Sequence, residues 1–407
     1  MKNRIAVAVG LLLSLFAVCS NAQTITWTKV WSTPGGGSPN TYYNGYHDIH
    51  YSPFIGKVIV RSTSTAGGAE SIYSSRLHFF DPITFTDQLI SDNGQASCCT
   101  CLPSTILIPY SAHPMGQIFV DNVRQRVWMM EGICRNFIPP EQWYYQLDNP
   151  ISGHTDWTQT HPAHLPTKLV SGVLNGLFMN AGIVHDTDHD AFILFGYDGN
   201  ANLHDMQVYC DTSLNGGILT PAQISVGCAN ADDWTDITSQ VTLNGPVPYN
   251  YYYANLEYDP VHQQIIHFAG LHGCCTVENQ TWTYDVLAKK WTNRNPANPP
   301  ANSSANNENG RVAHAYSLAD GKYYYHLTAH TPSTIGTAPS RPPEDWVYDA
   351  GANTWTHLAT GNGPFLSETM TYVPLPCNCL MAWAAKVNSD GKYYATGIAE
   401  MWVGKIQ

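Results

Sequence analysis

One short pattern recurs along the whole chain: an aromatic residue followed directly by threonine, in what we expect to be a short strand flanked by polar residues. It occurs at Trp27-Thr28, Phe85-Thr86, Trp157-Thr158, Trp234-Thr235, Trp291-Thr292 and Trp355-Thr356. Ahead of each copy from the second onward lies a stretch rich in tyrosine or tryptophan, at residues 77–81, 143–147, 206–209, 281–285 and 345–349. A sixth such stretch, residues 401–404, ends the chain with no copy after it. The unmatched copy at Trp27 therefore completes the unmatched stretch at Trp402.

These repeats predict a closed ring of strands. Repeats that cannot bury their own apolar face must stack, and units of four short strands point to a propeller. Pairing the N-terminal strand with the last blade also removes exposed sheet edges. We therefore expect an all-β fold, a six-bladed β-propeller closed by the N-terminal strand. The alternative is an irregular sandwich in which the aromatic-threonine pairs are coincidental.

Two further strands are expected ahead of each tyrosine-rich stretch, because β-branched and aromatic runs alternate there with Asn, Asp, Gly and Pro turns. Inner strands are expected at 47–51, 116–120, 181–185, 254–258, 312–316 and 368–372. Second strands are expected at 57–60, 127–130, 191–195, 265–268, 323–326 and 380–383. The near-constant interval between the two sets supports six equivalent blades.

The first 22 residues have the pattern of a secretory signal. Lys2 and Arg4 precede an apolar run from Ile5 to Val18, and small or polar residues follow before Gln23. We expect residues 1–22 to be removed and residues 23–407 to form one propeller domain, secreted or periplasmic. Cys19 raises lipidation as an alternative, but Val18 stands where a small residue is expected. No later segment has the ~20 apolar residues of a membrane span.

The net charge limits the kinds of partner that the protein can bind. Loss of Lys2 and Arg4 takes the formal charge from −12 to −14, which disfavours nucleic acid and anionic membranes as partners.

The cysteine count predicts disulfides. Of 11 cysteines, loss of Cys19 leaves an even number, as expected for five disulfides in an exported protein. The pairing we expect is Cys101 with Cys134, Cys98 with Cys99, Cys210 with Cys228, Cys274 with Cys275, and Cys377 with Cys379; sequence alone leaves other connectivities open.

Two stretches resemble kelch repeats. One is Ala313-His314-Ala315-Tyr316 with the turn 319–322, residues 345–349 and Trp355; the other is His267-Phe268-Ala269-Gly270 with residues 282–285 and Trp291. The resemblance implies a kelch-type propeller of the galactose-oxidase central-domain class. It implies a fold rather than an activity, since such propellers include adaptors, a sialic-acid epimerase and copper-radical oxidases.

In such a propeller, the loops entering the inner strands and those joining second to third strands share one face, where we expect the ligand. Aromatic and directional polar groups there suit a sugar ring. The expected binding residues are Tyr46, His113, Arg135, Asn180, His272 and His330. For catalysis, His47 or Tyr253 would act as general acid or base, with Arg311 stabilising negative charge, as in elimination or epimerisation of an acidic sugar.

Metal chemistry is the competing interpretation of the same face. His47, His113, His272 and His330 come from four blades and could converge on copper, calcium or zinc. Tyr46-His47 is similar to the Tyr-His step that donates copper ligands in galactose-oxidase-like enzymes, but no inner strand carries the cysteine that those enzymes need. If the ligand is a carbohydrate, we expect no cofactor.

A non-catalytic propeller that binds another protein is the third possible function. In each case we expect a monomer.

Overall fold

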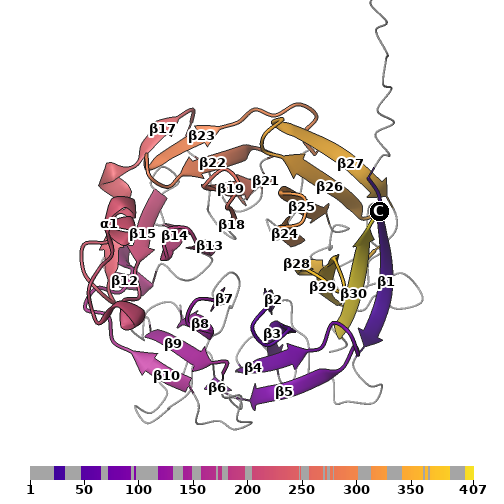
Figure 1. Ribbon diagram of the computed structural model, residues 1–407, viewed down its shortest axis with the longest axis horizontal. Helices are drawn as coiled ribbons and strands as arrows, with labels where there is room; N and C mark the ends of the chain where they lie inside the picture. The colour runs from indigo at the N-terminus through magenta and orange to yellow at the C-terminus, as the bar shows by residue number, and fades with distance from the viewer. Residues whose placement is uncertain are drawn as a thin grey trace, which may run out of the picture.

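Small antiparallel sheets stand as six blades around a central axis (Figure 1). The computed structural model describes residues 23–32, 47–65, 72–92, 96–97, 118–131, 141–148, 157–170, 173–176, 182–197, 204–246, 248, 256–268, 271–272, 276–277, 279–300, 313–327, 342–360, 363–364, 367–385 and 399–407. The architecture confirms the predicted all-β, six-bladed propeller.

In the first five blades, four strands follow one another in chain order from the inner to the outer edge. The first blade has β2 (His47–Ser52), β3 (Lys57–Thr65), β4 (Ile72–Phe80) and β5 (Asp87–Asp92), and the second has β7 (Ile118–Asp121), β8 (Arg126–Glu131), β9 (Glu141–Gln146) and β10 (Trp157–Thr160). The third has β13 (Gly182–Asp186), β14 (Ala191–Tyr197), β15 (His204–Tyr209) and β16 (Trp234–Asp236). The fourth has β18 (Leu256–Asp259), β19 (Gln264–Phe268), β22 (Thr281–Asp285) and β23 (Lys290–Asn293), and the fifth has β24 (Ala313–Ser317), β25 (Lys322–Leu327), β26 (Glu344–Asp349) and β27 (Thr354–Thr360).

Shorter elements decorate these sheets. The strands are β6 (Ala96–Ser97) beside β4, β17 (Thr242–Asn244) parallel to β23, and the hairpins β11 (Thr167–Val170) with β12 (Val173–Gly176) and β20 (Leu271–His272) with β21 (Thr276–Val277). The helices of the described residues are α1 (Pro221–Val226), η1 (Ser213–Asn215) and η2 (Thr238–Gln240). No helix in this part of the chain is long and apolar enough to cross a bilayer.

The sixth blade joins the two ends of the chain. It contains β28 (Ser367–Val373), β29 (Cys379–Ala385) and β30 (Ala399–Ile406), and β1 (Ile25–Ser32) forms its outer strand. Trp27 lies opposite Gly404, where an added Cβ would come within 3.0 Å of the indole, so only glycine gives the ring this room. Thr24 and Gln407 exchange backbone hydrogen bonds of 3.1 and 2.9 Å. The predicted closure by the N-terminal strand is confirmed.

The recurring tryptophans form the packing unit of four blades. Trp157, Trp234, Trp291 and Trp355 lie directly opposite Tyr145, Tyr209, Tyr284 and Tyr348 on the neighbouring third strands. Their ring centroids are 5.0 to 5.5 Å apart, within the range in which aromatic pairs attract. The sequence repeat is therefore a repeat of aromatic core pairs.

Several indoles also connect one blade to the blade before it. The Nε1–H of Trp157 donates to Ser91 Oγ of the first blade (3.2 Å). The same donor of Trp234 reaches Gln142 Oε1 of the second blade (2.7 Å). Trp355 reaches Thr281 Oγ1 of the fourth (2.9 Å). Each bond satisfies a buried donor that would be costly to leave unpaired, so the repeat also fixes blade against blade.

Phe85-Thr86 departs from the repeat, and its assignment to a strand is wrong. The strand β5 begins at Asp87, and Phe85 is 36% exposed with a positive φ of 56°. The cause is Asp81, whose Oδ1 accepts the backbone N–H groups of Ile83 and Thr84 and so forms a side-chain-stabilised turn. The buried apolar residue of this outer strand is Ile90 instead.

A buried ion cluster joins the second and third blades. Arg124, in the β7–β8 turn, donates to Asp190 Oδ1 and Oδ2 at 2.8 and 2.6 Å and to Asp121 Oδ2 at 3.2 Å. Its Nε lies 3.0 Å from Asp211 Oδ1, and Arg126 contacts Oδ2 of the same carboxylate at 2.7 Å. The Arg124 side chain is 1% exposed. The arginine fork therefore compensates carboxylates from three separate turns.

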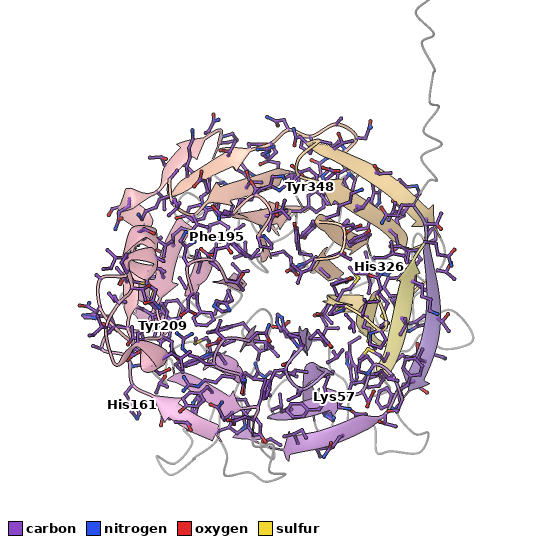
Figure 2. The ribbon with its side chains drawn as sticks, viewed as in Figure 1. Lys57, His161, Phe195, Tyr209, His326 and Tyr348 are labelled. Carbon is purple, nitrogen blue, oxygen red and sulfur yellow. A yellow bond between two sulfur atoms is a disulfide. The ribbon has the colours of Figure 1, made fainter. Side chains whose placement is uncertain are left out.

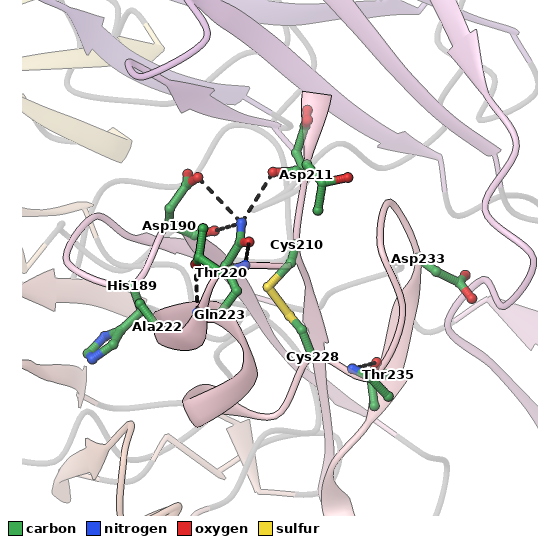
Figure 3. Close-up of a disulfide and its surroundings, with 12 residues drawn as sticks. His189, Asp190, Cys210, Asp211, Thr220, Ala222, Gln223, Cys228, Asp233 and Thr235 are labelled. Atoms are coloured by element: carbon green, nitrogen blue, oxygen red, sulfur yellow. Dashed lines mark hydrogen bonds between the residues drawn. A yellow bond between two sulfur atoms is a disulfide. The ribbon is translucent and has the colours of Figure 1, made fainter. Parts of the chain in front are cut away.

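The long connection after β15 is tied by a disulfide (Figure 3). Cys210 and Cys228 are bonded and both are buried. Between them α1 begins at a capping box, in which Thr220 and Gln223 satisfy each other's backbone N–H groups. The Gln223 amide also donates to the backbone carbonyls of Asp190 and Asp211 at 3.2 Å each. These bonds hold the long connection after β15 against the ion cluster. This bridge confirms the predicted pairing of Cys210 with Cys228.

Replacing both cysteines of this bridge by alanine is expected to lower the free energy of unfolding by about 3 kcal/mol. The reason is that the bond joins residues 18 positions apart and so restricts a loop in the unfolded chain. Equilibrium denaturation of the double variant against the parent measures the difference. A loss below about 0.5 kcal/mol would show that the capping box and the ion cluster hold this long connection in place without the disulfide.

Cys377 is bonded to Cys379, also as predicted. The remaining cysteines of the predicted set, Cys98, Cys99, Cys101, Cys134, Cys274 and Cys275, lie outside the described residues. Their pairing stays a prediction.

Candidate functional site

The six inner strands surround a central channel with a cavity of about 370 Å³. Figure 2 shows side chains projecting toward the opening at the centre of the ring. The wall between the last and first blades is tied by threonines of β28: Thr369 Oγ1 accepts the backbone N–H of Ile49 (3.2 Å), and Thr371 Oγ1 that of Tyr51 (3.1 Å). These bonds hold the first inner strand beside the last without a sheet ladder between them.

The first polar pair of the wall is Asp48 and His50. They are two residues apart on β2, so both side chains leave the same face of the strand. His50 Nε2 lies 3.2 Å from Asp48 Oδ1, without the alignment of a hydrogen bond, while Asp48 Oδ2 accepts the Ile118 N–H at 3.3 Å. The His50 side chain is 34% exposed, and its ring borders the channel. The Asp48 contact to β7 thus fixes the carboxylate that accompanies the imidazole.

The pKa of His50 lies above its ordinary value. Burial is the largest influence and lowers the pKa, but the attraction of Asp48, with a further contribution from Glu257, outweighs it. The imidazolium therefore persists to a higher pH than in a free histidine. The channel wall consequently carries an imidazolium that can donate a proton.

The second polar pair is Glu257 and His314. Glu257 belongs to β18 and His314 to β24, and His314 Nδ1 lies 3.0 Å from Glu257 Oε1. The imidazole stacks on Tyr323 with ring centroids 5.8 Å apart and planes 12° apart. Both side chains remain partly exposed, at 20% for His314 and 27% for Glu257. The stacking fixes the plane of the ring and leaves polar edges available to the channel.

The two pairs occupy opposite sides of the channel. β2 belongs to the first blade and β18 to the fourth, and these blades lie across the axis in a ring of six (Figure 1). The influence of Glu257 on the pKa of His50 fits this facing arrangement. A small molecule in the channel would therefore meet acid–base groups on two sides at once.

Aromatic rings line the channel toward the turns that join inner to second strands. Tyr51, Tyr258, Tyr316 and Tyr372 all contribute to the wall. The hydroxyls of three of them donate outward, Tyr258 to Asp188 Oδ2 (2.7 Å), Tyr316 to Asp259 Oδ1 (2.6 Å) and Tyr372 to Asn378 Oδ1 (2.6 Å). Burial, and for the first two the carboxylate partner, raises their pKa values, so the phenols stay neutral. The fixed hydroxyls leave the ring surfaces as the apolar part of the wall.

A third histidine connects the channel to the ion cluster. His185 of β13 lines the channel, and its ring stacks on Phe192 with centroids 4.4 Å apart. Its Nε2 lies 3.4 Å from Asp190 Oδ1. Because Asp190 is held by Arg124, the orientation of His185 depends on the contact between the second and third blades.

The site predicted from the sequence involves the opposite end of the inner strands. Of its residues, Tyr46, His113, Arg135, Asn180, Tyr253, Arg311 and His330 lie outside the described residues. His47 begins β2 and His272 ends β20, but their side chains are likewise outside the described set. The roles assigned to all nine residues stay predictions.

The channel pairs were not selected from the sequence, although part of the signal is visible there. In the stretch His47-Asp48-Ile49-His50, Ile49 is 1% exposed and packs in the core. Strand alternation then places Asp48 and His50 together on the other face. Nothing local links Glu257 to His314, 57 residues later, since only the packing of the fourth and fifth blades brings them together.

The alternative metal site also stays a prediction. Among the residues that the structure describes, no group of three or more His, Cys, Asp or Glu side chains is arranged to hold a metal ion. The four histidines proposed as ligands, His47, His113, His272 and His330, have side chains outside that set.

Comparison with known proteins identifies the fold only. No protein-family model matches the sequence, and no curated protein matches it either. A structure described as NanB plus Optactamide matches with a TM-score of 0.51 and 10% identity, over 92% of this chain and 70% of that one. A Dyadobacter fermentans protein of unknown function (TM-score 0.48, 10% identity, 94% and 100% coverage) and the Escherichia coli soluble aldose sugar dehydrogenase (0.46, 9%, 94% and 99%) also align. The six blades themselves place the chain in the class of β-propellers. The kelch resemblance finds no family match to support it.

Proposed function

We propose that the protein binds a carbohydrate in its central channel. The cavity of about 370 Å³ lies within the roughly 300–1,000 Å³ of small-ligand sites. It also combines ring surfaces with a few directional polar groups, the composition that orients small ligands. A small hydroxyl-rich molecule is the ligand that this combination favours.

The two facing histidine–carboxylate pairs carry the proposal. Each sugar hydroxyl donates one hydrogen bond and accepts others, so its partners must include donors and acceptors. Asp48 and Glu257 supply acceptors, while His50 and His314 supply ring nitrogens that donate or accept. The tyrosine rings at the turn end match the C–H-rich face of a sugar ring.

Turnover forms a second part of the proposal. We propose that His47 or Tyr253 moves a proton and that Arg311 stabilises the resulting negative charge in elimination or epimerisation. Substitution of His47 or Arg311 by alanine should then abolish formation of ultraviolet-absorbing unsaturated products or of the epimer, with nearly unchanged thermal unfolding. A large loss of stability would instead reassign these residues to structure.

We also propose that the ligand is met outside the cytoplasm. Two disulfides join described cysteines, and disulfides persist chiefly in oxidising compartments. The signal-like first 22 residues agree with export.

His50→Gln and Glu257→Gln are each expected to weaken sugar binding about 10- to 100-fold, because each removes a hydrogen bond to a charged group in the channel. His262→Gln is the matched control. His262 Nδ1 forms the same kind of pair with Asp259 Oδ2 (2.6 Å), but the residue does not line the channel. Calorimetric titration with the best ligand from a glycan array of neutral and acidic sugars gives the three affinities.

The pH dependence has a defined sign. Because the pKa of His50 is raised above about 6.5, the protonated donor is present below that pH and is lost as the pH rises through the raised value. Affinity is therefore expected to fall with rising pH in the parent and to vary less in His50→Gln. Absence of binding across the whole array, or equal loss of affinity in His262→Gln, would contradict the channel as a sugar site.

A further inference from the structure

The turn between β28 and β29 holds a disulfide between two residues separated by one. Cys377 and Cys379 are bonded across Asn378. Cys379 begins β29 and is fully buried, whereas Cys377 lies in the turn and is partly exposed. The two bonded residues therefore differ in their exposure to solvent.

This bond adds little to the fold that encloses it. The turn is already held by Asn378 N–H, which donates to the carbonyl of Pro374 at 3.1 Å, and by the bond of Tyr372 to the Asn378 side chain. Cys379 is also paired in the sheet, opposite Val373 on one side and Lys405 on the other. A disulfide restricts the unfolded chain less as the enclosed loop shortens. By contrast, Cys210 and Cys228 are 18 residues apart and tie down an excursion.

The surroundings of the bond suit attack by a thiolate from solvent. Leu375 is 82% exposed and Pro376 is exposed, so exposed apolar residues directly precede the partly exposed Cys377. Because Cys377 is the more exposed residue of the bonded pair, a thiolate from solvent reaches it first, and Cys379 is then the leaving group.

We propose that Cys377–Cys379 is a thiol–disulfide exchange site that accepts two electrons from a dithiol. One thiolate of the dithiol attacks Cys377 Sγ; the S–S bond breaks, and its electron pair goes to Cys379 Sγ, which takes up a proton. The second thiolate of the dithiol then attacks the dithiol's first sulfur, which is bonded to Cys377 in the mixed disulfide. This releases Cys377 Sγ, which takes up the second proton. The dithiol leaves as a disulfide, and the protein holds two thiols. The substrate class is a small or peptide-borne dithiol that reaches the exposed turn.

Graded reduction of the full-length protein by dithiothreitol tests the site, with alkylation and peptide mapping to read each cysteine. Cys377 and Cys379 are expected to become alkylated at a concentration at least about tenfold below that needed for Cys210 and Cys228, with the thermal unfolding temperature unchanged. The second disulfide is the control within the same molecule. Opening of both bonds together, or of Cys377–Cys379 last, would overturn the proposal.

Two single variants test which sulfur is attacked. With oxidised glutathione, Cys379→Ser should form a mixed disulfide at Cys377 at least about tenfold faster than Cys377→Ser forms one at the buried Cys379. Equal rates would overturn the assignment of Cys377. The double variant Cys377→Ser/Cys379→Ser should unfold at the parent temperature. A large fall in that temperature would show that the disulfide stabilises the fold, and this would also overturn the proposal.

Discussion

Replacing Arg124 by methionine is expected to lower the free energy of unfolding by about 3–5 kcal/mol, the cost of removing one partner from a buried ion cluster. The substitution keeps much of the side-chain volume but leaves Asp121, Asp190 and Asp211 without the guanidinium that they share. Denaturant unfolding of the variant and parent at neutral pH measures the loss. Lys57→Met is the matched control: Lys57 pairs with Asp81, but its side chain is 35% exposed, so the expected cost is at most about 1 kcal/mol.

The cluster also sets a pH dependence. Burial is the largest influence on the pKa of Asp190 and raises it, but the hydrogen bonds and charge of Arg124 bring it below its usual value. The stabilisation is therefore complete above the unfolded pKa of about 3.9 and is lost as the pH falls below it. The difference between parent and Arg124→Met should shrink on acidification. A constant difference down to pH 2, or a neutral-pH loss equal to that of Lys57→Met, would contradict this account.

Replacing Trp27 by alanine is expected to cost about 3–5 kcal/mol, as for other large buried aromatics. The indole is 8% exposed, its Nε1–H donates to Asp345 Oδ2 at 2.9 Å, and its ring meets His326 edge-on at 5.2 Å. His326 in turn bonds Asp345 at 2.7 Å, so removal of Trp27 also disturbs a buried polar pair of the fifth blade. Thermal and denaturant unfolding measure the effect.

The control for this prediction lies in the same strand. Lys29 pairs with Glu400 at 3.1 Å, and its side chain is 46% exposed, so Lys29→Ala should change the unfolding free energy by less than about 1 kcal/mol. Similar losses in the two variants would mean that pairing of the β1 backbone, rather than burial of the indole, closes the ring.

Most of the architecture could be predicted because the repeat is a packing unit. Trp157, Trp234, Trp291 and Trp355 recur because each needs a tyrosine opposite it, and that pairing depends on residues close in sequence. Phe85 could not be distinguished from them by residue type, because the outcome there was decided by Asp81 and its local hydrogen bonds.

The candidate site was harder to predict because its contacts join different blades. His50 and Asp48 share a strand, whereas the pairing of Glu257 with His314 depends on the angle between blades. Register alone favoured the loops that enter the inner strands, since loops commonly carry function. The described residues include the channel pairs but not those loops, so the roles of residues such as Arg311 stay predictions.

The union of β1 with β30 makes the order of synthesis matter. Among the described strands, β1 is synthesised before all the others and its sheet partner β30 after them. Until then β1 presents an unpaired edge, including Trp27, to whatever surrounds the growing polypeptide. Five blades can form without β1, but the sixth is complete only when β1 and β30 meet, so a chaperone that shields β1 would favour correct folding over misassembly with other chains.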